Sequence, residues 1–136
     1  MTVVDTSVWI DLLRATGSRE ERRLAELVER GAAVALTDLI YCEILQGVRG
    51  DADYARTRRA MRRFPILRLT RIGTFEHAAA LYRACRRRGL TVRRTSDCLI
   101  GALCIEEGAE ILHRDRDFDA IARVAPLRIH RVAAAP

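Results

Sequence analysis

The sequence predicts an α/β protein, a three-layer α/β/α sandwich with a central parallel sheet. First, short apolar or β-branched runs alternate along the chain with amphipathic helical patterns. Second, no hairpin signal joins any two strand-like runs, so helical crossovers are expected to connect the strands and make them parallel. Third, the 136 residues are 49% hydrophobic, which suffices for one sizeable core.

In the first half of the chain, start and stop signals delimit the expected elements. Ser18 and Glu21 have the spacing of a capping box, so a helix is expected to begin there. Gly31 ends that helix, because glycine readily adopts the left-handed conformation of a helix terminus. The β-branched run before Asp5 predicts the first strand. The expected elements are strands at 2–4 and 32–36, and helices at 7–13 (capped by Ser7), 18–30, 38–47 (starting at Thr37 or Asp38) and 51–63.

In the second half, two further glycines end helical patterns. Gly89 and Gly108 each follow an apolar periodic segment. Pro65 precedes the third strand-like run. The expected elements are strands at 66–69, 110–112 and 127–130, and helices at 74–88, 96–107 and 120–124. Residues 1–132 are therefore expected to form a single domain and residues 133–136 a disordered tail.

The charged residues limit the catalytic mechanisms that the chain can use. All 24 basic residues are arginine, against 18 acidic residues, for a net charge of +6. An arginine-rich surface suits phosphate groups, and the codon bias of a GC-rich genome produces the same composition. The absence of lysine excludes every mechanism that needs a catalytic lysine. No segment approaches the roughly 20 apolar residues of a membrane span, and no signal peptide precedes the first strand, so a cytoplasmic protein without membrane contact is expected.

The four cysteines indicate buried thiols rather than a metal site. Cys42, Cys85, Cys98 and Cys104 form no C-x-x-C pair, and three of them lie in apolar helical patterns. A structural zinc site is therefore not expected. Reduced cysteines that act as small hydrophobic residues are expected instead.

Four acidic residues stand at unusual places. Asp5 follows the first predicted strand and Asp115 the fourth, and ligands of open parallel sheets bind beyond the carboxyl ends of strands. Glu43 and Asp97 lie within apolar helices, where an ionised carboxylate is costly unless it is paired or bound to a metal. Each acid alone has a structural explanation, such as a strand–helix turn, an ion pair of Glu43 with Arg49, or a favourable helix dipole.

Together, the four carboxylates favour a divalent-cation site. Converging carboxylates repel each other unless cations lie among them, and oxygen-only ligands suit Mg²⁺ or Mn²⁺. One or two such ions can activate water for attack on a phosphodiester. The chain has no G-x-x-x-x-G-K-[ST], G-x-G-x-x-G, G-x-S-x-G or H-E-x-x-H motif. A receiver domain would need a lysine, and an aspartyl-phosphate phosphatase would need a second Asp where Ser7 stands.

Four segments of the chain resemble a known family. They read VVDTSVW at 3–9, EILQG at 43–47, TSDCLI at 95–100 and HRDRDF at 113–118. Their order and approximate spacing are similar to those of PIN-domain ribonucleases, and most similar to the VapC toxins of bacterial toxin–antitoxin pairs. The resemblance covers about residues 2–130.

The resemblance implies Mg²⁺- or Mn²⁺-dependent endonucleolytic cleavage of RNA, with tRNA as the common target. It also implies a homodimer and a VapB-like antitoxin that blocks the acidic site. By this resemblance, the catalytic and metal-binding residues are Asp5, Glu43, Asp97 and Asp115, and the auxiliary residues are Ser7, Ser96 and Asp117. Asn is common in relatives at the position of Ser96, and the choice between Asp115 and Asp117 as ligand stays open.

Arginines near the acidic residues are expected to steer RNA toward the site, although a solvated helix end would look the same. Trp9 is expected in the core or a dimer interface rather than as a base-stacking platform. The alternative function is a catalytically inactive PIN-like module that binds RNA or protein. The RNA-binding candidates are Arg86, Arg87, Arg88, Arg93, Arg94, Arg114 and Arg116.

Overall fold

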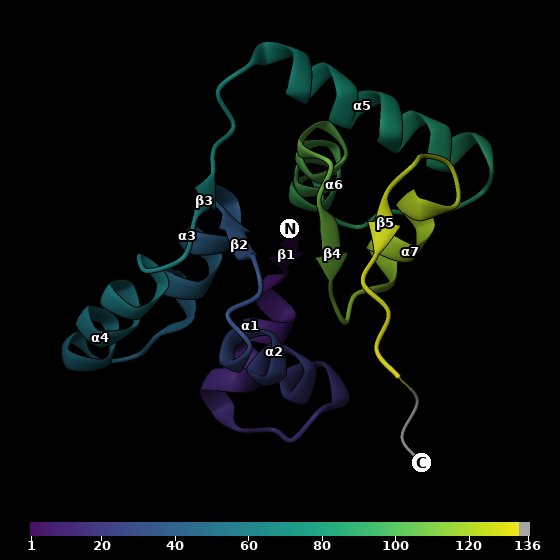
Figure 1. Cartoon of the computed structure of the whole chain (residues 1–136). Helices are drawn as coiled ribbons and strands as arrows, with labels where there is room; N and C mark the ends of the chain where they lie inside the picture. The colour runs from purple at the N-terminus through teal and green to yellow at the C-terminus, as the bar shows by residue number, and fades with distance from the viewer. Residues whose placement is uncertain (134–136) are drawn as a thin grey trace.

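The computed structural model describes residues 1–133 and contains a central, all-parallel sheet (Figure 1). The strand order is β3-β2-β1-β4-β5, so β1 lies in the middle with β2 on one side and β4 on the other. Thr2 of β1 is in register with Val34 and with Glu110. The predicted parallel α/β fold is confirmed. The strands are β1 (Thr2–Val4), β2 (Val34–Thr37), β3 (Ile66–Leu67), β4 (Glu110–Leu112) and β5 (Arg128–Ile129).

The helices form two groups. The helices of each group pack against one another, and the two groups lie apart in Figure 1. The chain moves from β1 to β3 in one direction and then crosses back to β4, so right-handed crossovers put the two groups on opposite faces of the sheet. One group is α1 (Thr6–Arg14), α2 (Arg19–Glu29), α3 (Asp38–Gly47) and α4 (Asp51–Met61). The other is α5 (Ile72–Arg87), α6 (Thr95–Glu107) and α7 (Arg116–Ala122).

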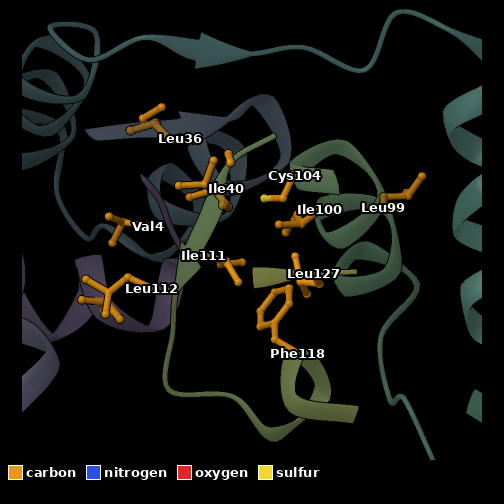
Figure 2. Close-up of a cluster of buried hydrophobic side chains, with 14 of the residues drawn as sticks. Val4, Leu36, Ile40, Leu99, Ile100, Cys104, Ile111, Leu112, Phe118 and Leu127 are labelled. Carbon is orange, nitrogen blue, oxygen red and sulfur yellow. The ribbon is translucent and has the colours of Figure 1, made fainter. Parts of the chain in front are cut away.

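The core covers both faces of the sheet, and on one face it is built around α6, whose residues 97–104 are all buried. Figure 2 shows Ile100 and Ile111 close to the ring of Phe118 from α7. Gly101 lets α7 approach, because a Cβ there would lie 3.4 Å from the Cδ1 atom of Ile121. α6 thus packs against β4, and α7 packs against α6 and β5.

Trp9 belongs to this core. Its side chain is 1% exposed, its Nε1 donates to the Val4 carbonyl at 2.9 Å, and its ring lies 5.1 Å from that of Phe64. The indole is covered within the chain itself, so it is neither a base-stacking platform nor an interface residue.

Several predicted boundaries are wrong. β2 begins at Val34 rather than at residue 32, and β3 ends at Leu67 because the Leu69 amide donates to the Asp38 side chain at 2.9 Å instead of extending the ladder. The helix α5 begins two residues earlier than predicted, and α7 begins at Arg116 rather than at residue 120. α1 is capped by Asp5, not by Ser7.

Three of the four thiols are buried, and Cys42 is exposed on α3, contrary to expectation. Burial raises the pKa of the Cys98 thiol to about 11 and that of Cys104 to about 12. Among residues 1–133, no helix has the length and apolar character needed to cross a membrane. The predicted tail at 133–136 falls largely on residues 134–136, which lie outside the described residues.

Candidate metal centre

The site is built at the carboxyl ends of β1 and β4, the point where the strand order reverses. Asp5 follows β1 directly, is only 6% exposed, and donates its backbone N–H to the Leu112 carbonyl of β4 at 2.9 Å. Asp115 stands three residues after β4. The two acids that the sequence places after strands therefore face the same edge of the sheet.

Ser7 connects these two strand ends. Its Oγ donates to Oδ2 of Asp5 at 2.8 Å, and its backbone N–H donates to the same oxygen at 3.3 Å. The Ser7 Oγ in turn accepts the backbone N–H of Arg114 at 3.2 Å. One hydroxyl group therefore orients the Asp5 carboxylate and holds the turn that carries Asp115.

Three carboxylates from α6 and from the start of α7 form a cluster. Asp97, Asp115 and Asp117 each offer an oxygen, and the three oxygens lie within 4.8 Å of one another. Asp115 caps α7, since its Oδ1 accepts the Asp117 backbone N–H at 2.9 Å. Asp117 is 1% exposed and belongs to the acidic cluster.

Several buried carboxylate oxygens at the site have no donor. Among residues 1–133, Oε1 of Glu43, Oδ2 of Asp97 and Oδ1 of Asp117 are buried without a hydrogen-bond partner. The hydroxyl of Thr6, next to Asp5 in sequence, is also unpaired. Buried polar atoms are normally satisfied, because an unpaired carboxylate oxygen loses its hydration without compensation. These orphaned oxygens indicate that a positively charged ligand belongs here.

The electrostatics agree with this interpretation. Burial raises the pKa of Asp5 above its usual range. Burial and the nearby charge of Asp5 raise the pKa of Glu43. The pKa of Asp97 rises to about 8, first through burial, then through the adjoining carboxyl of Asp117 and the charges of Asp5 and Asp115. The donor set contains only oxygen, which suits a hard divalent cation such as Mg²⁺ or Mn²⁺.

Arg93 already supplies one positive charge to the cluster. Its backbone N–H donates to Oδ2 of Asp117 at 3.0 Å, and its Nη2 lies 3.2 Å from Oδ1 of Asp115. Its Nε lies 3.6 Å from Oδ1 of Asp117. The Arg93 side chain is nevertheless 51% exposed, so it can leave the carboxylates at little cost.

The other arginine candidates have different environments. Arg88 donates to the Arg123 carbonyl at 2.7 Å and so closes the end of a helix. Arg114 pairs with Asp11 and lies 3.7 Å from Glu20, away from the cluster. The charge of Arg94 lowers the pKa of Glu43, which places this guanidinium within electrostatic reach of the site. The remaining candidates Arg86, Arg87 and Arg116 lie on the surface.

Glu43, Ser96 and Asp11 have different environments in the structure. Glu43 has no ion pair with Arg49 among the described residues, so that structural explanation of its position is wrong. Ser96 is half-buried and directly precedes Asp97 at the start of α6. Sequence reasoning overlooked Asp11, a buried acid on α1 that accepts from Ser18 at 2.8 Å and also from Arg114. Its burial on α1 becomes visible only in the folded chain.

Known proteins resemble this chain in sequence and in fold. A family model for the PIN domain matches residues 2–124. Ribonuclease VapC11 of Mycobacterium tuberculosis is 45% identical over 131 residues, covering 94% of this chain and 96% of that protein. Two solved structures share the fold: VapBC2 from Rickettsia felis bound to a promoter DNA fragment, and VapC20 of Mycobacterium tuberculosis, a sarcin–ricin loop cleaving toxin. The first has a TM-score of 0.74 at 14% identity and covers 95% of this chain and 96% of that chain. The second has a TM-score of 0.66 at 18% identity and covers 94% and 99%.

Proposed function

Because the chain belongs to the PIN-domain family, and within it to the VapC ribonucleases of VapBC toxin–antitoxin systems, we propose that it is a Mg²⁺- or Mn²⁺-dependent endoribonuclease. The observation that carries the metal dependence is the set of buried, unpaired carboxylate oxygens at the reversal point of the sheet. Asp5, Asp97 and Asp115 hold the cation, Glu43 completes the acidic set from α3, and Asp117 is an auxiliary ligand.

When bound, such a cation supplies activation of water and stabilisation of charge on the phosphodiester. The protein residues prepare the site for it. Ser7 engages only Oδ2 of Asp5 and leaves Oδ1 available as a ligand. Ser96 lies in the first turn of α6, directly before Asp97, and is proposed as an auxiliary residue there. Glu43 has a raised pKa and a half-buried side chain, so it is suited to hold a proton during hydrolysis.

The cleaved RNA is a structured cellular RNA, with tRNA as the first substrate to test and ribosomal RNA as the next, since one structural relative is a sarcin–ricin loop cleaving toxin. A nuclease of this kind needs restraint in the cytoplasm. A VapB-like antitoxin partner is therefore part of the proposal, supported by the structural similarity to a VapBC complex. A homodimeric assembly is proposed on the family resemblance alone.

The competing function is a PIN-like module that binds RNA or a partner protein without catalysis. A module without a metal would gain nothing from keeping Asp97 and Asp117 buried with unpaired oxygens. Their desolvation opposes folding, so the arrangement favours a catalytic site over a simple binding surface.

The test is cleavage of total cellular RNA by purified protein with Mg²⁺ or Mn²⁺, with EDTA, and with an Asp5→Asn variant. Asparagine keeps an oxygen that can accept from Ser7, so the fold should survive while the metal ligand is weakened. The matched control is Asp53→Asn, an exposed aspartate on α4 that pairs with Arg56. Discrete fragments are expected only with metal, and only from the wild type and the control. Wild-type cleavage by Asp5→Asn would show that this acid is not part of the active site.

A further inference from the structure

A second cavity lies between α5 and the start of α6, outside the acidic cluster. Its volume is about 530 Å³. We propose that this cavity is a nucleotide subsite, in which an unpaired base of the RNA stacks on Tyr82 next to the phosphate to be cleaved. The subsite rests on the proposed ribonuclease function and adds to it a site that selects RNA with an unstacked base. The residues that carry the argument are Phe75, Tyr82, Arg83, Arg86, Val92 and Arg93.

Aromatic rings are scarce on this surface and gather at the cavity. Aromatic residues make up only 5% of the chain. Among residues 1–133, the exposed aromatic side chains are Tyr54, Phe75 and Tyr82, and the last two flank this cavity at 45% and 43% exposure. An exposed ring beside a buried apolar floor, here Val92, is the environment in which single-stranded nucleic acids stack their bases.

The Tyr82 ring already holds a planar cationic group. The Cζ atom of Arg86 lies 5.7 Å from the centroid of this ring, which is a cation–π distance. Arg86 thus occupies the position over the ring that a flat partner would take, and a nucleobase can stack there when Arg86 turns to a phosphate.

The charge of the cavity complements a nucleotide and not a peptide of mixed charge. Within the described part of the chain, Arg83, Arg86 and Arg93 line the cavity and no carboxylate does. The larger groove near α1, α3 and α4, about 660 Å³, combines arginines with Asp53 and has no aromatic lining residue. Cations together with exposed rings are the combination that tracks a phosphate backbone and its bases.

Arg93 connects the cavity with the candidate metal centre. The same side chain lines the cavity and lies 3.2 Å from Asp115. A strand whose phosphate lies at the acidic cluster would therefore meet Arg93, which also lines the cavity beside Tyr82. This continuity is the reason to assign the cavity to the RNA substrate rather than to a second protein chain.

The experiment measures binding of a fluorescent single-stranded 12-nucleotide RNA by anisotropy in the Asp5→Asn background with Mn²⁺, so that the probe stays intact. A second probe of equal length carries abasic residues and has the same phosphates without the bases. Tyr82→Ala is expected to weaken binding of the intact probe about tenfold and to leave the abasic probe unaffected. Tyr82→Phe should bind like the parent. Tyr54→Ala removes an equally exposed tyrosine on α4 and should also bind like the parent.

Three results would overturn the subsite. Tyr82→Ala could bind the intact probe as well as the parent does, or it could lose affinity equally for both probes, which would show that no base stacks there. In the third, light scattering during gel filtration would show that Tyr82→Ala converts a dimer into a monomer, so that a second copy of the chain covers the cavity. None of these outcomes bears on the proposed ribonuclease function. That function is tested separately, by comparing metal-dependent RNA cleavage by the wild type and by Asp5→Asn.

Discussion

Arg93→Gln is expected to tighten divalent-cation binding, because the guanidinium competes with the cation for Asp115 and Asp117. The structure gives it two carboxylate contacts, at 3.2 and 3.6 Å. Each contact of a half-exposed ion pair contributes about 0.2–1 kcal/mol, so together they oppose the cation by about 1 kcal/mol. That corresponds to a dissociation constant for Mn²⁺ about fivefold lower in the variant. Glutamine keeps the backbone N–H bond to Asp117, and much of the side chain's bulk.

Isothermal titration with Mn²⁺ at low and high salt checks this expectation. The control is Arg116→Gln, which removes the same charge next to Asp115 but has no ion pair among the described residues. If both variants tightened Mn²⁺ binding equally, the effect would be a general change of charge rather than the release of a competing side chain. Unchanged binding in Arg93→Gln would refute the competition outright. The same variant should bind single-stranded RNA more weakly, so the two ligands respond with opposite signs.

Three further predictions follow from the contacts around the site. Asp97 keeps its proton to about pH 8 in the folded, metal-free protein and loses it near 3.8 when unfolded, so the free energy of unfolding should fall as pH rises from about 4 to about 8. Thermal melts in EDTA should show this fall and saturating Mn²⁺ should remove it; a rise in the same window would contradict the assignment. Ser7→Ala should reduce the initial rate of RNA cleavage about 10- to 100-fold, because Asp5 loses its orienting hydroxyl; Ser7→Thr is the matched control, and equal rates would exclude this role. Trp9→Phe removes the donor to the Val4 carbonyl and should lower the free energy of unfolding by about 1–3 kcal/mol in urea titrations; an unchanged midpoint would count against that hydrogen bond.

The fold follows from the sequence where local signals and burial agree. The strand at Thr2–Val4 and the helix α6 were predictable, because an apolar run marks each of them and an acid or a glycine follows its end. The boundaries that failed depend on contacts across the chain. β3 stops because the Leu69 amide donates to an Asp38 oxygen 31 residues away, and no local sequence pattern predicts such a hydrogen bond.

The site shows the same division. That Asp5 and Asp115 share an edge was predictable, since both follow parallel strands. The acid that caps α7 was not predictable, because Asp115 and Asp117 are equally good caps in sequence, and only the folded chain shows that Asp115 caps the helix while Asp117 is buried. The cavity beside Tyr82 could not be predicted from the sequence either, because it forms between α5 and α6, which contact each other only in the folded chain.

The central position of β1 has a consequence for how the protein is made. Asp5 leaves the ribosome early, whereas its neighbours on β4 and α7 lie about 110 residues later. At about 5–20 residues per second, synthesis separates Asp5 from Asp115 by about 5–20 s. Throughout that interval β1 has an open edge on the side where β4 will insert, and the acids of the two halves have not met. The acidic site therefore assembles only after residues 115–117 have emerged.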